Sequence, residues 1–155
     1  MGTLVLRPEA WIAGTRRPLA GSAVAEAEPA GVELRTLPES YAIARLPGDA
    51  VVPPWVGGQE FLAVVRTRNE LSIVCREDAV PPDLTEVQRE FRCLVVAGTL
   101  DFAQTGIIAQ LAQPLAQAGI PIFGISTYDT DHILVREEHL EEAKSALRAA
   151  GHTVR

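Results

Sequence analysis

The chain of 155 residues is short of the residue types on which many catalytic and metal sites depend. It has two cysteines, three histidines and 5% aromatic residues. His132, His139 and His152 show no HxxxH or HxH spacing, and no combination of His, Cys and carboxylate has the spacing of a complete metal-ligand set. Phosphate-binding glycine loops and the GxSxG nucleophile motif do not occur. The sequence therefore predicts no metal and no cofactor, and it disfavours an enzyme.

The two cysteines are not spaced as a metal-binding or redox pair. Cys75 and Cys93 each lie in an apolar run without a CxxC neighbour. We interpret them as buried thiols that pack like small hydrophobic side chains. A disulfide between them stays open, although a reducing compartment would not favour one.

Basic residues and long hydrophobic runs are also scarce. Lys and Arg number 14 against 20 Asp and Glu, so the net charge is −6. Proteins that bind a phosphate backbone normally carry a basic face, so the sequence predicts no nucleic-acid partner. No apolar run approaches the roughly 20 residues of a membrane helix. Neither does the N-terminus have the pattern of a signal peptide, so we expect a cytoplasmic protein without a membrane partner.

The second half of the chain carries the clearest pattern of elements. Three short runs rich in β-branched residues predict strands, namely Cys93–Ala97, Ile120–Ile125 and His132–Val135. Apolar residues at three- and four-residue spacing predict amphipathic helices over Thr105–Ala118 and Glu137–Ala149. Gly119 and Gly151 follow these helices as C-caps, and His152–Val154 can add a short edge strand. The order βαββαβ is that of the ferredoxin-like fold.

The first half repeats this order in shortened form. Alternating or apolar runs predict four strands, namely Val32–Leu37, Tyr41–Leu46, Phe61–Thr67 and Leu71–Cys75. Prolines limit residues 53–58 to a single helical turn. Residues 81–90 are expected to connect the halves, with Asp83 capping a short helical turn. Residues 1–31 contain several prolines and are expected to form a loosely docked or disordered extension.

Two polar segments in the second half predict a binding site. Residues 98–106 join a strand to a helix start, where free N–H groups and the helix dipole attract a carboxylate; Thr105 is a candidate N-cap. Residues 126–131, Ser-Thr-Tyr-Asp-Thr-Asp, lie one strand away. Asp131 abuts an apolar run, so its carboxylate would be partly buried and would need a cationic or hydrogen-bonding partner. A free amino acid offers both an ammonium and a carboxylate.

Simpler interpretations of the same residues stay open. The hydroxyls of Thr127 and Thr130 could bond only to their own turn. Tyr128 could be a surface aromatic that covers the helix, and Asp129 a solvated turn residue. Gln104 could be a plain polar residue at a helix start.

The strings LDFAQTGI, AGIPIFGISTYDTDHILV and EEHLEEAKSALRAAGH resemble the ACT domain, and more narrowly the small bacterial tandem-ACT proteins related to the CASTOR arginine sensors. The resemblance is strong over Arg92–Val154 and weaker over Glu39–Ala79. It implies an α+β fold of tandem ferredoxin-like (ACT, βαββαβ) units with antiparallel sheets. The implied domains are the extension over 1–31, a degenerate ACT-like unit over 32–82 and an ACT domain over 91–155.

The resemblance also implies a set of ligand-binding residues. In the arginine-sensing ACT proteins the ligand lies between two ACT units, which contact it through a loop and helix start, a strand end and a strand of the other unit. The matching positions of this sequence are Gln104, Gly106, Ile107, Thr127, Tyr128, Asp131, Ser72 and Ile73. Asp131 would meet a cationic side chain or amino group. The sensors of animals carry four ACT units, so this shorter chain would need a homodimer.

The predicted function is therefore non-catalytic, regulatory binding of a free amino acid, with arginine as one candidate, at an ACT–ACT interface. A protein partner would receive the signal. The first alternative is a protein-interaction module with a vestigial ligand site. The second is a small ferredoxin-like enzyme, which would need Asp129 or Asp131 beside a histidine in a deep pocket.

Overall fold

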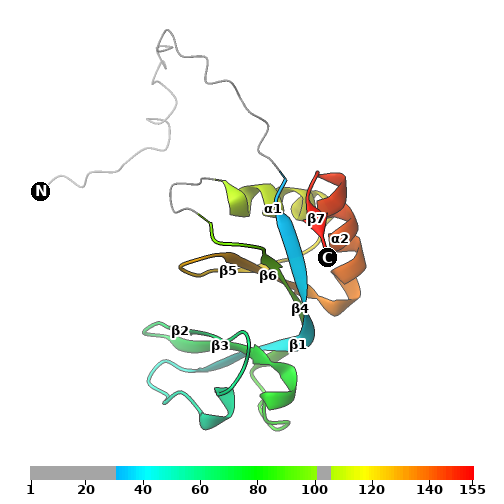
Figure 1. The fold of residues 1–155 in the computed structure, drawn as a ribbon. Coiled ribbons are helices and arrows are strands. Elements are labelled where there is room, and N and C mark those ends of the chain that lie inside the picture. Colours follow the sequence, from blue (N-terminus) through cyan, green and yellow to red (C-terminus); the bar gives the residue numbers. More distant parts are fainter. Residues whose placement is uncertain (1–30, 101–105) are drawn as a thin grey trace, which may run out of the picture.

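The computed structural model describes residues 31–100 and 106–155. It shows an α+β fold in which a mostly antiparallel seven-stranded sheet carries two α-helices (Figure 1). The strands are β1 Glu33–Pro47, β2 Ala63–Arg66, β3 Glu70–Arg76, β4 Val87–Val96, β5 Phe123–Ser126, β6 Asp131–Arg136 and β7 Thr153–Val154. The helices are α1 Ile107–Gln117 and α2 Leu140–Ala149, with the 3-10 turns η2 Pro54–Val56, η3 Glu77–Ala79 and η4 Glu137–His139. The expected extension over residues 1–31 lies outside the described residues, apart from Gly31.

One long strand replaces the two strands that were predicted over Val32–Leu37 and Tyr41–Leu46. β1 runs through both segments, and its pairing with β4 shifts register between Thr36 and Ser40. The prediction was wrong because it ended a strand where the residue alternation breaks at Pro38. The irregularity in register lets the strand continue past the proline, which lacks an N–H group for a regular ladder.

The connection between the halves was also predicted wrongly. Pro82 and Asp83 form a turn, but no helical turn follows, and β4 begins at Val87 rather than at Cys93. The added residues pair with the second part of β1, as in Ala44 opposite Val87. This pairing satisfies the backbone N–H and C=O groups of the added residues. The prediction missed these residues because it depended on short apolar runs, which do not indicate backbone pairing.

The two long strands make a single sheet instead of a separate sheet for each half. Its order is β2-β3-β1-β4-β6-β5, and β7 pairs in parallel with the start of β1. The expected neighbourhood of β4 and β6 is confirmed by antiparallel pairs such as Cys93 with Leu134. Figure 1 shows the β2–β3 and β5–β6 hairpins extending to the same side of the molecule.

Both α-helices pack on one face of the second half, as their apolar spacing predicts. Three residues of each helix are buried in the same cluster: Ile107, Leu111 and Leu115 of α1, and Leu140, Ala143 and Leu147 of α2. The strands contribute Leu94 and Ile133 to this core. Gly119 closes α1 with a positive φ of 72°, which an L side chain rarely adopts. The predicted second helix starts as the 3-10 turn η4 before α2 begins.

Aromatic contacts join the two halves on the other face of the sheet. Phe61, which precedes β2, stacks on His132 of β6 with ring centroids 4.2 Å apart and an interplanar angle of 6°. Tyr41 of β1 meets the same phenyl ring edge-on at 5.7 Å. These rings pack with Cys93, Val95 and other residues in a core formed by both halves.

The cysteines are free thiols, as interpreted from the sequence. Cys75 and Cys93 are both buried, and burial raises their pKa values to about 11 and about 12. His152 directly precedes β7, at the start of the edge strand that was expected over His152–Val154. It is buried, and its Nδ1 accepts a hydrogen bond of 3.2 Å from the backbone N–H of Val32. Among the described residues, no helix has the length and apolarity to cross a bilayer.

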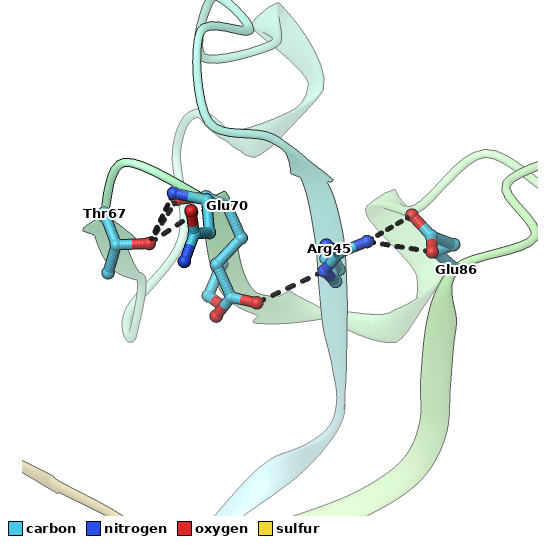
Figure 2. A network of polar contacts seen from close by, with 6 residues as sticks. Arg45, Thr67, Glu70 and Glu86 are labelled. Atoms are coloured by element: carbon cyan, nitrogen blue, oxygen red, sulfur yellow. Dashed lines mark hydrogen bonds and ion pairs between the residues drawn. The ribbon is translucent and has the colours of Figure 1, made fainter.

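An exposed ion-pair network ties the far end of the first half together (Figure 2). The guanidinium of Arg45 on β1 contacts Glu70 at 3.2 Å and Glu86 at 2.9 Å. It therefore links the start of β3 to the residue before β4. Both partners raise the pKa of Arg45, the hydrogen bond to Glu70 most.

Candidate functional site

A cavity of about 280 Å³ lies where the start of α1 meets the tip of the β5–β6 hairpin. Its wall comes from the strand-to-helix connection, the first turn of α1 and the hairpin. The lining residues are Leu100, Gly106, Ile107, Ile108, Ala109, Ser126, Thr127, Tyr128, Asp129, Thr130 and Asp131. The two polar segments singled out in the sequence are thus brought together.

The helix side of the cavity presents backbone donors. Gly106 is the N-cap of α1 with a φ of 83°, and among the described residues no side chain caps the helix start. The first helical hydrogen bond runs from the N–H of Gln110 to the carbonyl of Gly106, at 2.9 Å. The preceding N–H groups, those of Ile107, Ile108 and Ala109, belong to the helix end that favours negative charge. Thr105, the expected N-cap, lies outside the described residues.

The hairpin side is held by its own threonines. Thr127 donates its backbone N–H to the carbonyl of Thr130 at 2.8 Å, and its hydroxyl bonds to the N–H and carbonyl of the same residue. The Thr130 hydroxyl donates to the carbonyl of Val96 at 2.7 Å. The Thr127 hydroxyl thus bonds within its own turn, as the simpler interpretation expected, whereas the Thr130 hydroxyl bonds outside the turn, to β4. The threonines shape the turn and anchor it to β4.

A second backbone contact fixes the hairpin against the strand-to-helix connection. The N–H of Leu100 donates to the carbonyl of Asp129 at 2.7 Å. The Asp129 side chain itself is exposed, and Tyr128 at the tip is 80% exposed. The two walls of the cavity are therefore positioned before any ligand arrives, which reduces the entropy cost of binding.

Asp131 is the buried charge of the site. Only 8% of the residue is exposed, and its Oδ1 accepts a hydrogen bond of 2.6 Å from the hydroxyl of Ser126. The two residues are directly opposite each other in the β5–β6 ladder. Within residues 31–100 and 106–155, no cationic side chain forms an ion pair with this carboxylate. A buried carboxylate that faces a cavity can receive a cation from a ligand.

The expected site residues divide into three groups. Five of them line the cavity: Gly106, Ile107, Thr127, Tyr128 and Asp131. Gln104 lies outside the described residues. Ser72 and Ile73 lie on β3, and neither lines this cavity; Ile73 is fully buried, and the Ser72 hydroxyl donates to Glu70 at 2.9 Å.

Sequence reasoning missed several lining residues. Ser126 was grouped with the polar hairpin but was not assigned to the ligand, and the register between strands is what identifies its contact with Asp131. Leu100, Ile108 and Ala109 were not named either. Leu100 follows the end of β4, and Ile108 and Ala109 lie in the first turn of α1. The sequence placed the start of this helix at Thr105, two residues before Ile107.

The histidine required by the enzymatic alternative does not face this cavity. His132 follows Asp131, but successive side chains of a strand point to opposite faces. Its ring stacks on Phe61 in the other core, and burial lowers its pKa more than Asp131 raises it. Among the described lining residues, two carboxylates are the only ionisable groups besides the Tyr128 phenol.

Comparisons with known families agree on the second half. A model of the ACT domain matches residues 86–149. A separate model, described as an N-terminal domain, matches residues 39–83. The two matched segments correspond to the two halves, which the pairing of β1 with β4 joins in one sheet.

Solved structures resemble the chain over most of its length. Protein Atu0741 from Agrobacterium tumefaciens is 40% identical, with a TM-score of 0.76 over 81% of this chain and 92% of that chain. VC0802 from Vibrio cholerae, described as a protein of unknown function and possible transport protein, is 21% identical with a TM-score of 0.64, covering 76% and 88%. The regulatory subunit of aspartate kinase from Thermus flavus is 13% identical with a TM-score of 0.55, covering 78% and 98%. The last two likenesses concern the fold alone.

Proposed function

We propose that this chain, which belongs to the ACT domain family, binds a free amino acid as a regulatory ligand and does not transform it. The fold is shared with a protein described as the regulatory subunit of aspartate kinase. Fold alone does not assign a function, so the proposal depends on the site.

One observation carries the proposal: a buried carboxylate and a helix start lie in the same small cavity. Asp131 is 8% exposed, and α1 begins at Gly106, where no side chain of a described residue forms a cap. The helix start stabilises an anionic group, and the carboxylate stabilises a cationic one. An α-amino acid supplies both charges a few ångströms apart.

We also propose that the first half is a degenerate ACT-like unit and that two chains associate. In this proposal the units are residues 32–82 and 91–155, and the ligand lies at an interface between units. Ser72 and Ile73 would then contribute from a unit other than the one that holds Asp131. Two edge strands with exposed apolar side chains support association, with Val65 54% exposed on β2 and Phe123 37% exposed on β5.

Thermal unfolding against the twenty free amino acids tests the function. A ligand that binds only the folded state at about a hundred times its Kd stabilises by about 2.7 kcal/mol. We expect one or a few amino acids to raise the unfolding temperature by several degrees. Asp131→Asn should abolish the shift, whereas Asp129→Asn, an exposed carboxylate in the same turn, should keep most of it. A flat response of the wild-type protein to all twenty would refute the proposal.

The same edge strands favour one second candidate, a protein-interaction module. Unpaired strand edges with apolar side chains offer backbone groups to another chain. If no amino acid shifts the unfolding temperature while the protein still self-associates in sedimentation velocity, this candidate replaces the first.

A further inference from the structure

We propose that Ser126 positions Asp131 to receive a cationic group, ammonium or guanidinium, and that the site therefore rejects acidic amino acids. This inference rests on the proposed function and names the ligand class. Ser126 is not among the predicted ligand-binding residues. The charge of the cavity is set by the residues that line it in the folded protein.

A hydrogen bond from Ser126 fixes the orientation of the Asp131 carboxylate. Ser126 and Asp131 face each other across the β5–β6 ladder, and the Ser126 hydroxyl donates to Oδ1 at 2.6 Å. Oδ2 accepts no hydrogen bond from a described residue, while the side chain lines the cavity. A hydroxyl fixed on one oxygen stops rotation of the carboxylate and leaves the other oxygen for the ligand. Ser126 is thus a positioning residue rather than a ligand contact.

The described residues that line the cavity carry negative charge only. Asp129 and Asp131 are its acidic side chains, and no lysine, arginine or histidine occurs among the described lining residues. One ligand carboxylate can use the N–H groups at the start of α1. A second carboxylate would meet two aspartates without a compensating cation, which like-charge repulsion at short range disfavours. The site therefore suits neutral and cationic amino acids.

The cationic group has two sources in amino acids, the α-ammonium and a basic side chain. Asp131 can pair with either, because both donate charge-assisted hydrogen bonds to a carboxylate. Leucine carries only the first, and arginine carries both. Binding of both would assign the α-ammonium, and binding of arginine alone would assign the side chain; each result supports a cation receptor.

Isothermal titration with L-arginine, L-leucine, L-glutamate and 2-hydroxyisocaproate tests the charge class. The last compound is leucine with its ammonium replaced by a hydroxyl. We expect arginine or leucine to bind, and glutamate and the hydroxy acid to bind at least about tenfold more weakly. Glutamate or the hydroxy acid binding as tightly as the better of arginine and leucine would overturn the inference. If no amino acid of the full set binds, the proposed function itself fails.

A matched pair of variants tests the positioning role. Ser126→Thr and Ser126→Val have nearly the same shape on a strand and differ in the hydroxyl. We expect Thr to keep the affinity within about threefold and Val to lose about tenfold, because a hydrogen bond to a charged group is lost. Equal affinities of the two variants in the wild-type background would refute the role, while the amino-acid binding itself would stand.

Discussion

The β2–β3 and β5–β6 hairpins are built on the same turn but have different surroundings. Thr67 donates its backbone N–H to the carbonyl of Glu70 at 2.8 Å, and its hydroxyl accepts from the N–H of Asn69. The same hydroxyl accepts from the N–H of Glu70 (Figure 2). Thr127 forms the same backbone bond to Thr130, also at 2.8 Å. The two threonines are 60 positions apart. The internal repeat, predicted from element order alone, is therefore also present in individual residues.

The correspondence continues along the strands that follow. With the same offset, Ile73 matches Ile133, both fully buried, and Arg76 matches Arg136, each followed by a 3-10 turn. One position differs in chemistry: Leu71 in the first hairpin matches Asp131 in the second. Leu71 is fully buried beside Val56 of η2, while Asp131 faces the cavity at the start of α1.

The two hairpins differ in the element that lies next to each of them. In the first half a short turn with apolar residues fills the space, and a leucine completes the packing. In the second half a full helix presents its N-terminus, and an aspartate faces it. The turn is the same in both hairpins, and the neighbouring element determines which groups face it.

The largest effect is expected for Leu71→Ala. Deleting a fully buried side chain removes transfer free energy and leaves a cavity, so unfolding should become easier by about 2–5 kcal/mol in urea denaturation. The matched Asp131→Ala variant should lose far less stability without ligand. Similar losses in the two variants would mean that Asp131 is a structural residue.

Asp131→Leu makes the second hairpin resemble the first. Loss of the charged acceptor should weaken amino-acid binding by about a hundredfold in isothermal titration, since charged hydrogen bonds contribute about 1.5–3 kcal/mol. The unfolding temperature without ligand should stay the same or rise, because a buried carboxylate is exchanged for an apolar group. Retained affinity would exclude Asp131 from the site.

Because the pKa of His132 is lowered in the folded protein, we expect stability to depend moderately on pH. Burial lowers its pKa below the ordinary value of 6.5, Asp131 opposes this shift and Arg35 adds to it. The unfolded chain then takes up a proton more readily, so this contribution to stability is complete above about pH 6.5 and falls as the pH drops through the lowered folded pKa.

The control for this dependence is His132→Phe, which keeps a ring to stack on Phe61. Urea denaturation from pH 5 to 7.5 should show a flatter profile for the variant than for the wild-type protein. Parallel profiles would assign the pH dependence to other groups.

The smallest effect is expected for Arg45→Ala. Its two ion pairs are exposed, with half of the arginine side chain accessible, so water and salt screen them and their removal should change stability little. Stability measured in low and high salt should converge between variant and wild type at high salt. A loss comparable to that of Leu71→Ala would show that the network of Figure 2 is essential to the first half.

Much of the second half could be predicted because its signals are local. The spacing of Ile107, Leu111 and Leu115 defines the buried face of α1, and glycine closes the helix. The polar hairpin and the helix start, which were predicted to lie close together, line one cavity. Both depend on short stretches of sequence in which neighbouring residues decide the local conformation.

The first half was less predictable because its strands depend on distant partners. Leu34 pairs with Val96 and Ala44 with Val87, so the length of β1 is set by β4 rather than by its own residue pattern. Likewise, the burial of His152 follows from the backbone of Val32, at the opposite end of the described chain.

The sequence by itself determined the helices, the turn residues and the order βαββαβ, because these follow from periodicity and local hydrogen bonding. Only the tertiary structure decided that one sheet serves both halves, that Ser126 contacts Asp131, and that Asp131 rather than Leu71 faces an open cavity. These features depend on register and on which element covers each hairpin. Contacts between residues far apart in the chain set both, and a pattern read along the chain does not contain them.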